Sequence, residues 1–238
     1  MRKTLLLPAL AALAVSAPVH ALNLDVNGVT VGTEFNDGIK DVLQKVNPAY
    51  QITDIKEGKQ IVGYIAAVGN KYDPFDAFVV MAEKDGKIWF AGRRQKLSEG
   101  KRIAPDVLLA ALKEKYSDYS AYGASLYYSN TAQAIWRYSR DTSHIPLPAI
   151  KDDPCADQRY ANFHNVPYPV RFAPGCQIAI SAEWREDDDK LISHYTVTAY
   201  DARAIHEELR KQQEQAEIEQ QKAREKAAAE GQSNKPNL

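Results

Sequence analysis

Apolar and polar residues follow two successive patterns in the first half of the chain, one typical of a helix and one typical of strands. Apolar residues between Phe35 and Val46 recur at helical spacing, and Asn47-Pro48 ends this helix. Segments with alternating apolar residues follow, and they predict strands at 50–56, 61–68, 77–83 and 87–94. The last two flank Lys84-Asp85-Gly86, a sequence typical of a hairpin turn.

The order of helix and then strands is repeated in the second half. Pro105 begins a helix whose apolar residues run from Val107 to Tyr116. Further segments have strand character, at 124–129, 132–139, 176–185 and 191–200. Between them, the stretch 140–174 contains six prolines, and we interpret it as irregular. The pattern predicts an α+β fold made of antiparallel β meanders, each led by an α-helix.

The composition changes at Ala202. Residues 202–230 are rich in Glu, Gln, Lys, Arg and Ala, and neither Gly nor Pro occurs until Gly231. This predicts a long charged C-terminal helix, either a solvated extension or one strand of a coiled coil. The predicted organisation is a signal peptide at 1–21, an N-terminal α+β half at 22–116, a C-terminal β-rich half with a disulfide loop at 117–201 and a charged helical tail at 202–238. Whether the two halves form separate domains stays open at this point.

The first 21 residues have the three parts of a secretory signal peptide. Arg2 and Lys3 are followed by an apolar run from Leu5 to Val15 and then by Val19-His20-Ala21. The apolar run is too short to span a bilayer, so we expect cleavage after Ala21 rather than a membrane anchor. The sequence therefore predicts an exported periplasmic protein with no integral membrane segment in the mature chain.

Charge is nearly balanced over the 238 residues. Lys and Arg total 30 against 31 Asp and Glu, a net charge of −1. Loss of Arg2 and Lys3 with the signal peptide leaves a mildly acidic mature chain. Because nucleic-acid binding relies on a surplus of basic residues, we predict no nucleic-acid partner.

Cys155 and Cys176 are the two cysteines of the chain. In an oxidising compartment, a lone pair of this kind favours a disulfide. The alternative is a metal site that recruits His144 and His164, but the spacings match no common ligand motif. We predict a disulfide, and we predict neither a metal ion nor a cofactor.

The segment 116–140 is unusually rich in tyrosine, interspersed with Ser, Ala, Gly and Asn. Aromatic rings beside small polar residues are typical of binding surfaces, although alternate rings can equally complete a core. The candidate binding residues are Tyr116, Tyr119, Tyr122, Tyr127, Tyr128, Trp136 and Tyr138. We predict a non-catalytic binding or inhibitor/immunity-type protein that uses this surface against an envelope protein. The alternative is a peptidoglycan- or glycan-associated module, in which the rings stack on sugars.

No nucleophile elbow, phosphate-binding loop, zinc-protease or dinucleotide motif occurs in the sequence. No catalytic residue is predicted, although an unrecognised hydrolase that uses His144 or His164 as a base remains an alternative. The acidic run Glu186-Asp187-Asp188-Asp189 lacks the spacing of a calcium loop and is interpreted as a solvated turn.

Basic residues cluster after the first meander, where they could form a rim around an acidic partner. The cluster consists of Arg93, Arg94, Lys96, Lys101 and Arg102. The segment GVTVGTEFNDGI at 28–39, followed by a helix and a meander, resembles the helix-plus-antiparallel-sheet modules of periplasmic inhibitors and small outer-membrane assembly proteins. No functional residue is transferred from this resemblance.

Overall fold

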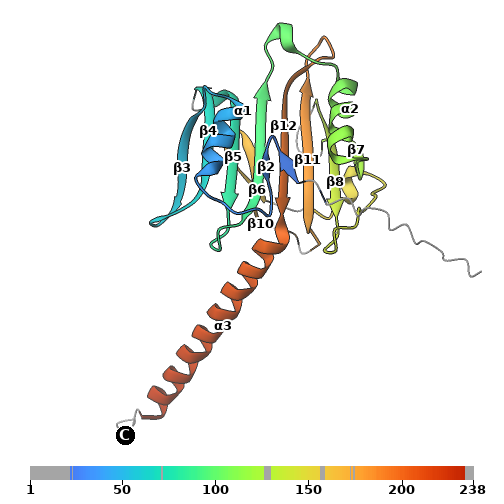
Figure 1. Cartoon of the computed structure of the whole chain (residues 1–238). Coiled ribbons are helices and arrows are strands. Elements are labelled where there is room, and N and C mark those ends of the chain that lie inside the picture. The colour runs from blue at the N-terminus through green and yellow to red at the C-terminus, as the bar shows by residue number, and fades with distance from the viewer. Residues whose placement is uncertain are drawn as a thin grey trace, which may run out of the picture.

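The structure is a computed structural model, shown in Figure 1. It describes residues 22, 24–70, 72–125, 130–155, 159–171, 173 and 175–233. The predicted signal peptide at 1–21 lies outside these residues, as do two of the candidate binding residues, Tyr127 and Tyr128.

One antiparallel sheet of eight strands forms the centre of the protein, in the order β3-β4-β5-β6-β12-β11-β8-β7. The strands are β3 (Gln51–Glu57), β4 (Gln60–Asn70), β5 (Asp73–Ala82), β6 (Ile88–Lys96), β7 (Ala121–Ala124), β8 (Thr131–Tyr138), β11 (Ile178–Glu186) and β12 (Ile192–Asp201). With the helices below, this confirms a mixed α+β fold. The sheet contains strands from both predicted halves of the chain, 22–116 and 117–201. They are joined where β6 pairs with β12, and this register places Thr196 opposite Arg94.

Helices and a short hairpin cover one face of the sheet, which we call the helix face. They are α1 (Gly38–Val46), α2 (Pro105–Tyr116) and the hairpin of β1 (Asp25–Val26) with β2 (Val29–Thr30). Alternate residues of the strands point to this face and bury their apolar side chains against the helices. Leu43 of α1, Trp136 of β8 and Trp184 of β11 are fully buried there. This core holds α1 and α2 in place.

The opposite face, which we call the hairpin face, is covered only in part. The hairpin of β9 (Arg159–Phe163) with β10 (Val166–Arg171) packs on it, and so does the first turn of α3 (Ala202–Ser233). Cys155 and Cys176 lie in the same apolar cluster and form the predicted disulfide, with a Sγ–Sγ distance of 2.06 Å. Two 3₁₀ turns, at Glu99–Lys101 and Ile150–Asp152, complete the elements.

The prediction that 140–174 is irregular is wrong in part, because β9 and β10 lie within it. Their turn is made by His164 and Asn165, both in the left-handed region with φ of 50° and 63°. A two-residue turn of this kind usually carries Asn-Gly or Asp-Gly. This hairpin gave no sequence signal, because its turn has no glycine and β10 contains Pro167 and Pro169, which are unusual within a strand.

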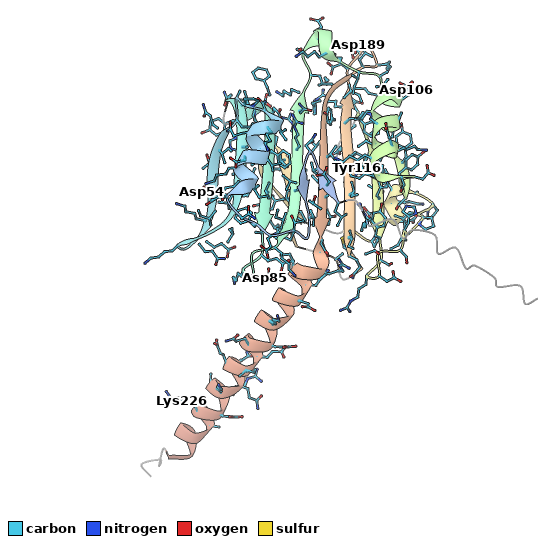
Figure 2. The ribbon with its side chains drawn as sticks, viewed as in Figure 1. Asp54, Asp85, Asp106, Tyr116, Asp189 and Lys226 are labelled. Carbon is cyan, nitrogen blue, oxygen red and sulfur yellow. A yellow bond between two sulfur atoms is a disulfide. The ribbon has the colours of Figure 1, made fainter. Side chains whose placement is uncertain are left out.

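Helix α3 leaves the body of the protein after its first turns. Ala202 is fully buried and the imidazole Nε2 of His206 lies 3.0 Å from the Cys176 carbonyl oxygen. Every side chain described between 211 and 228 is exposed, and Figure 2 places Lys226 far out along the helix. A helix that is polar on all sides has no apolar face to bury, so it extends into solvent. Within the described residues, none of the helices combines the length and the apolarity needed to cross a membrane.

Candidate functional site

Three of the predicted binding residues belong to the core rather than to a surface. Tyr116, Trp136 and Tyr138 are exposed by 4%, 0% and 6%. The Tyr116 hydroxyl donates to the Asp25 carbonyl at 2.6 Å, and the Trp136 indole donates to the Ser117 carbonyl at 3.0 Å. Their burial removes these three residues from the predicted binding surface.

Tyr119 and Tyr122 are the described members of the predicted surface that remain accessible. Their ring centroids are 5.7 Å apart. Tyr122 stacks on Trp184 at 5.8 Å, and the Lys113 ammonium lies 4.7 Å from the ring centre of Tyr119. Each ring is thus already occupied on one side by a residue of the body, which leaves a small aromatic patch rather than a row of free rings.

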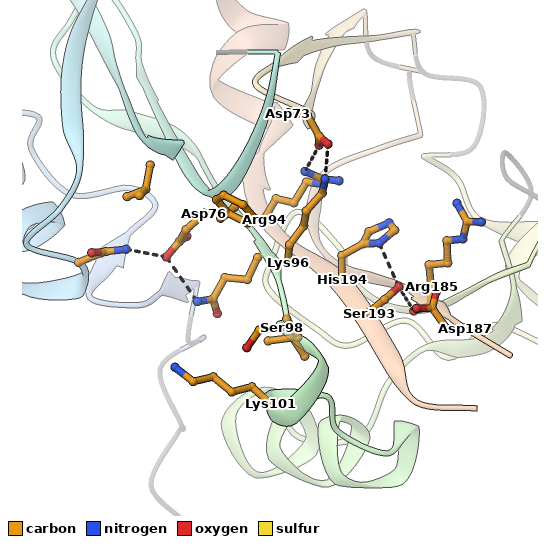
Figure 3. A pocket seen from close by; sticks show the side chains of 15 residues that line it. Asp73, Asp76, Arg94, Lys96, Ser98, Lys101, Arg185, Asp187, Ser193 and His194 are labelled. Carbon is orange, nitrogen blue, oxygen red and sulfur yellow. Dashed lines mark hydrogen bonds and ion pairs between the residues drawn. The ribbon is translucent and has the colours of Figure 1, made fainter. Parts of the chain in front are cut away.

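The structure gathers cations at a different place, a pocket of about 810 Å³ near the ends of β5, β6, β11 and β12. Figure 3 shows Arg94, Lys96, Lys101 and Arg185 around it. We call this the basic pocket. Phe75, with 66% of its surface exposed, stands at the rim. Strand alternation explains part of this arrangement, since Arg94 and Lys96 lie two residues apart on β6 and share the hairpin face.

The carboxylates in the basic pocket neutralise only some of this charge. Asp73 binds the ammonium of Lys96 and lies 3.5 Å from the guanidinium of Arg94. Asp187 pairs at 3.0 Å with Arg102, which does not line the pocket. Lys101 and Arg185 form no ion pair with any described residue. The pocket therefore keeps a positive surplus that suits an anionic ligand.

Asp76, the third carboxylate of the pocket wall, takes part in a hydrogen-bond network on the helix face. It accepts from the Tyr50 hydroxyl at 2.6 Å and from both Nε and Nη2 of Arg93, at 3.0 and 2.7 Å. Burial by itself would raise the pKa of Asp76, but the Arg93 and Tyr50 hydrogen bonds outweigh it and hold the pKa below its ordinary value. The network fixes the wall, and it leaves Asp76 no role as a free acid or base.

His194 lies between the basic pocket and a neighbouring pocket, and it lines both. Burial, and then the positive charges of Arg94, Arg185 and Lys96, lower the pKa of His194 from 6.5 to about 4. The imidazole is therefore neutral at physiological pH. It offers a hydrogen bond to a ligand without adding to the charge of the site.

Replacing His194 by glutamine is expected to make the protein less sensitive to acid between pH 6.5 and 4. As the pH falls through this window, His194 becomes protonated in the unfolded chain but stays neutral in the folded protein. Protonation therefore favours the unfolded chain, and the free energy of unfolding decreases. The ring is partly exposed, and with solvent screening the difference is at most about 2 kcal/mol. Urea unfolding of both proteins at about pH 7.5 and about pH 4.5 measures it. Equal losses of stability in the two proteins would contradict the assignment.

The histidines of the hydrolase alternative lie elsewhere. His144 contacts a serine, with Nε2 3.1 Å from Ser120 Oγ, but Ser120 is buried and its oxygen already accepts from the Arg137 amide at 2.7 Å. His164 sits in the β9–β10 turn. Within the described ranges, no three His, Cys, Asp or Glu residues are grouped so that they could hold a metal ion. The acidic run at 186–189 lies at the β11–β12 turn, where Asp187 and Asp189 bind Arg102.

The comparisons with known proteins add no further information on this site. No family model, no curated protein and no solved structure matches the chain.

Proposed function

We propose that the chain is a non-catalytic binding protein of the periplasm, of the inhibitor or immunity type, and that it captures an acidic segment of an envelope protein in the basic pocket. The observation that carries this proposal is the convergence of four cations on one open pocket beside an exposed aromatic ring. The proposal moves the binding surface from the tyrosines of 116–140 to the ends of β5, β6, β11 and β12.

Two exposed aromatic residues favour a protein partner over a small ion. Tyr72 and Phe75 are exposed by 81% and 66%, at the start of β5. Phe75 lies against Gly69, where a Cβ atom would be 2.9 Å from the ring. Exposed aromatic rings near a charged pocket are typical anchors of protein interfaces. An acidic side chain in the pocket, with apolar neighbours on these rings, satisfies both features.

The disulfide and the N-terminal segment bear on the compartment of the protein. An intramolecular disulfide fits an exported protein, because such bonds persist in oxidising compartments. The three-part N-terminal segment supports the same conclusion. Together they support a partner in the cell envelope.

Charge reversal in the basic pocket tests the proposal. We expect tagged wild-type protein, residues 22–238, to capture one acidic envelope protein in stoichiometric amounts. The double variant Lys101→Glu/Arg185→Glu is expected to capture it at least tenfold less well, because two unpaired cations become repulsive charges. The readout is quantitative mass spectrometry, followed by direct affinity measurement with the purified partner.

The matched control reverses two exposed cations far from the pocket, as Lys59→Glu/Lys222→Glu. Both side chains are exposed, one in the β3–β4 turn and the other on α3. The control is expected to bind like the wild type. Loss of capture in both double variants would show a dependence on total charge, and undiminished capture by the pocket variant would refute the proposed site.

A further inference from the structure

The hairpin face of the sheet carries a row of polar side chains across four neighbouring strands. The register places Arg94 of β6 opposite Thr196 of β12, Thr196 opposite Glu183 of β11, and Glu183 opposite Gln133 of β8. Arg94, Thr196 and Gln133 are each exposed by less than a tenth. Elsewhere on the hairpin face, the strands carry the apolar residues that pack against the β9–β10 hairpin. Burying polar side chains lowers the stability of the fold unless they form hydrogen bonds, either within the protein or with a ligand.

A second pocket, of about 510 Å³, lies over this row. Its floor includes Arg94, Glu183 and Thr196, and the tip of the β9–β10 hairpin contributes Asn162 and Asn165. We call it the polar slot. Asn165 also donates from its side-chain nitrogen to the carbonyl of Tyr72, the residue before β5, at 3.1 Å, which connects the hairpin tip to the start of that strand. Its volume falls in the range of small-molecule sites, about 300 to 1,000 Å³.

Arg94 forms the anion-binding end of the polar slot. Its two contacts, with Asp73 Oδ1 and with the Pro74 carbonyl, are both 3.5 Å long and both use Nη1. Burial lowers the pKa of this guanidinium, because Asp73 compensates it only weakly. No described residue pairs with Nε or Nη2. A buried guanidinium with two nitrogens to spare suits the planar oxygens of a carboxylate.

Glu183 forms the other end. It accepts from the Ser125 hydroxyl at 2.6 Å, and no described cation pairs with it. Burial raises the pKa of Glu183 against the opposing effect of the Ser125 hydrogen bond, and the carboxyl oxygens can accept further hydrogen bonds. Beside it, the buried Oε1 of Gln133 has no hydrogen-bond partner among the described residues. Within the slot itself, the carboxyl group of Glu183, the Thr196 hydroxyl and the two asparagine amides match the hydroxyls of a polyol.

We propose that the polar slot binds a small carboxylic acid rich in hydroxyl groups, of the class of the hexuronic acids. The carboxylate binds Arg94, and the hydroxyls bind Thr196 and Glu183. Arg94 and Glu183 lie on strands β6 and β11, which are separated by β12, so their backbones are about 10 Å apart. One sugar ring that forms hydrogen bonds at both of its ends can bridge this distance. The site goes beyond the proposed function, because neither Glu183 nor Thr196 lines the basic pocket.

The test measures binding of D-glucuronate to the full mature protein by isothermal titration calorimetry. D-glucose lacks the carboxylate and hexanoate lacks the hydroxyls, so each removes one half of the proposed recognition. We expect glucuronate to bind and both analogues to bind at least tenfold more weakly. No heat with glucuronate up to about 10 mM, or equal binding of the three compounds, would overturn the proposal.

Two matched variants locate the site. Thr196→Val removes one hydroxyl from the floor of the slot at nearly constant shape, and we expect it to weaken glucuronate binding about threefold to tenfold. Thr198→Val makes the same change two residues further along β12, outside the slot, and is expected to leave binding unchanged. Equal effects of the two variants would refute this location. The single charge reversal Lys101→Glu is expected to weaken partner capture and to leave glucuronate binding unchanged, because Lys101 does not line the slot, so the two proposals fail separately.

Discussion

Replacing Asp153 by alanine is expected to lower the free energy of unfolding by about 3 to 5 kcal/mol, the usual cost of removing one partner of a buried ion pair. Arg137 and Asp153 have side chains that are 2% and 7% exposed. The guanidinium of Arg137 donates through Nε to Asp153 at 2.6 Å and through Nη1 to the Ile180 carbonyl at 2.7 Å. Without the carboxylate, the cation stays buried and loses its counter-charge. Urea denaturation at neutral pH measures the loss.

The control for this prediction is an ion pair at the surface. Arg102 and Asp189 lie 3.1 Å apart with side chains that are 24% and 46% exposed. Asp189→Ala is expected to cost less than about 1 kcal/mol, because solvent screens this pair. The double variant Arg137→Met/Asp153→Leu is expected to recover most of the stability, since it leaves no buried charge unpaired. Equal losses from Asp153→Ala and Asp189→Ala would contradict the role given to burial.

The fold class could be predicted from the sequence, because alternation on a half-buried sheet is a strong local signal. Tyr195, Val197 and Ala199 alternate on the helix face of the segment 191–200, which forms β12. The order of the strands in the sheet, unlike the fold class, could not be predicted from local patterns. Pairing of β6 with β12 joins residues about a hundred positions apart, such as Gln95 and Tyr195. Neither strand carries a residue that specifies the other, so the central pairing of the sheet had no local signal.

The tyrosine-rich segment shows why composition did not identify a surface. Trp136 and Tyr138 lie two residues apart on β8, and both point to the helix face, where α2 covers them. A tyrosine has an apolar ring and a polar hydroxyl, so the same residue can complete a core or bind a partner. What decides is the neighbouring element, and Tyr116 is placed by a hydrogen bond to Asp25, which is distant in sequence.

The basic cluster, in contrast, contained part of the candidate site. Arg93 and Arg94 are adjacent on β6 and therefore point to opposite faces. Arg93 meets Asp76 on the helix face, and Arg94 reaches both the basic pocket and the polar slot. Arg185 and His194 join from β11 and β12, where they are cross-strand partners. Arg185 and His194 lie near Arg94 because β6 pairs with β12. The complete pocket therefore could not be predicted before the strand order was known.

Removal of the disulfide, as Cys155→Ala/Cys176→Ala, is expected to lower the free energy of unfolding by about 3 kcal/mol. The two cysteines are 21 positions apart, and cross-linking them restricts the unfolded chain over the intervening loop. The urea dependence of unfolding is also expected to rise, because the unfolded chain without the cross-link exposes more surface. Reductant should destabilise the wild type by a similar amount and leave the double variant unchanged. A wild type that is indifferent to reductant would contradict the prediction.

The disulfide also connects stability to the polar slot. Cys155 and Cys176 are buried in the same cluster as Val166 of β10, under the hairpin whose tip borders the slot. Loss of the cross-link removes a constraint from the segment that contains β9 and β10, so the position of Asn162 and Asn165 becomes less fixed. We therefore expect the cysteine variant to bind D-glucuronate more weakly even under conditions where it is fully folded. The basic pocket is formed by β5, β6, β11 and β12 and should keep its partner affinity, because none of its lining residues belongs to the cross-linked segment.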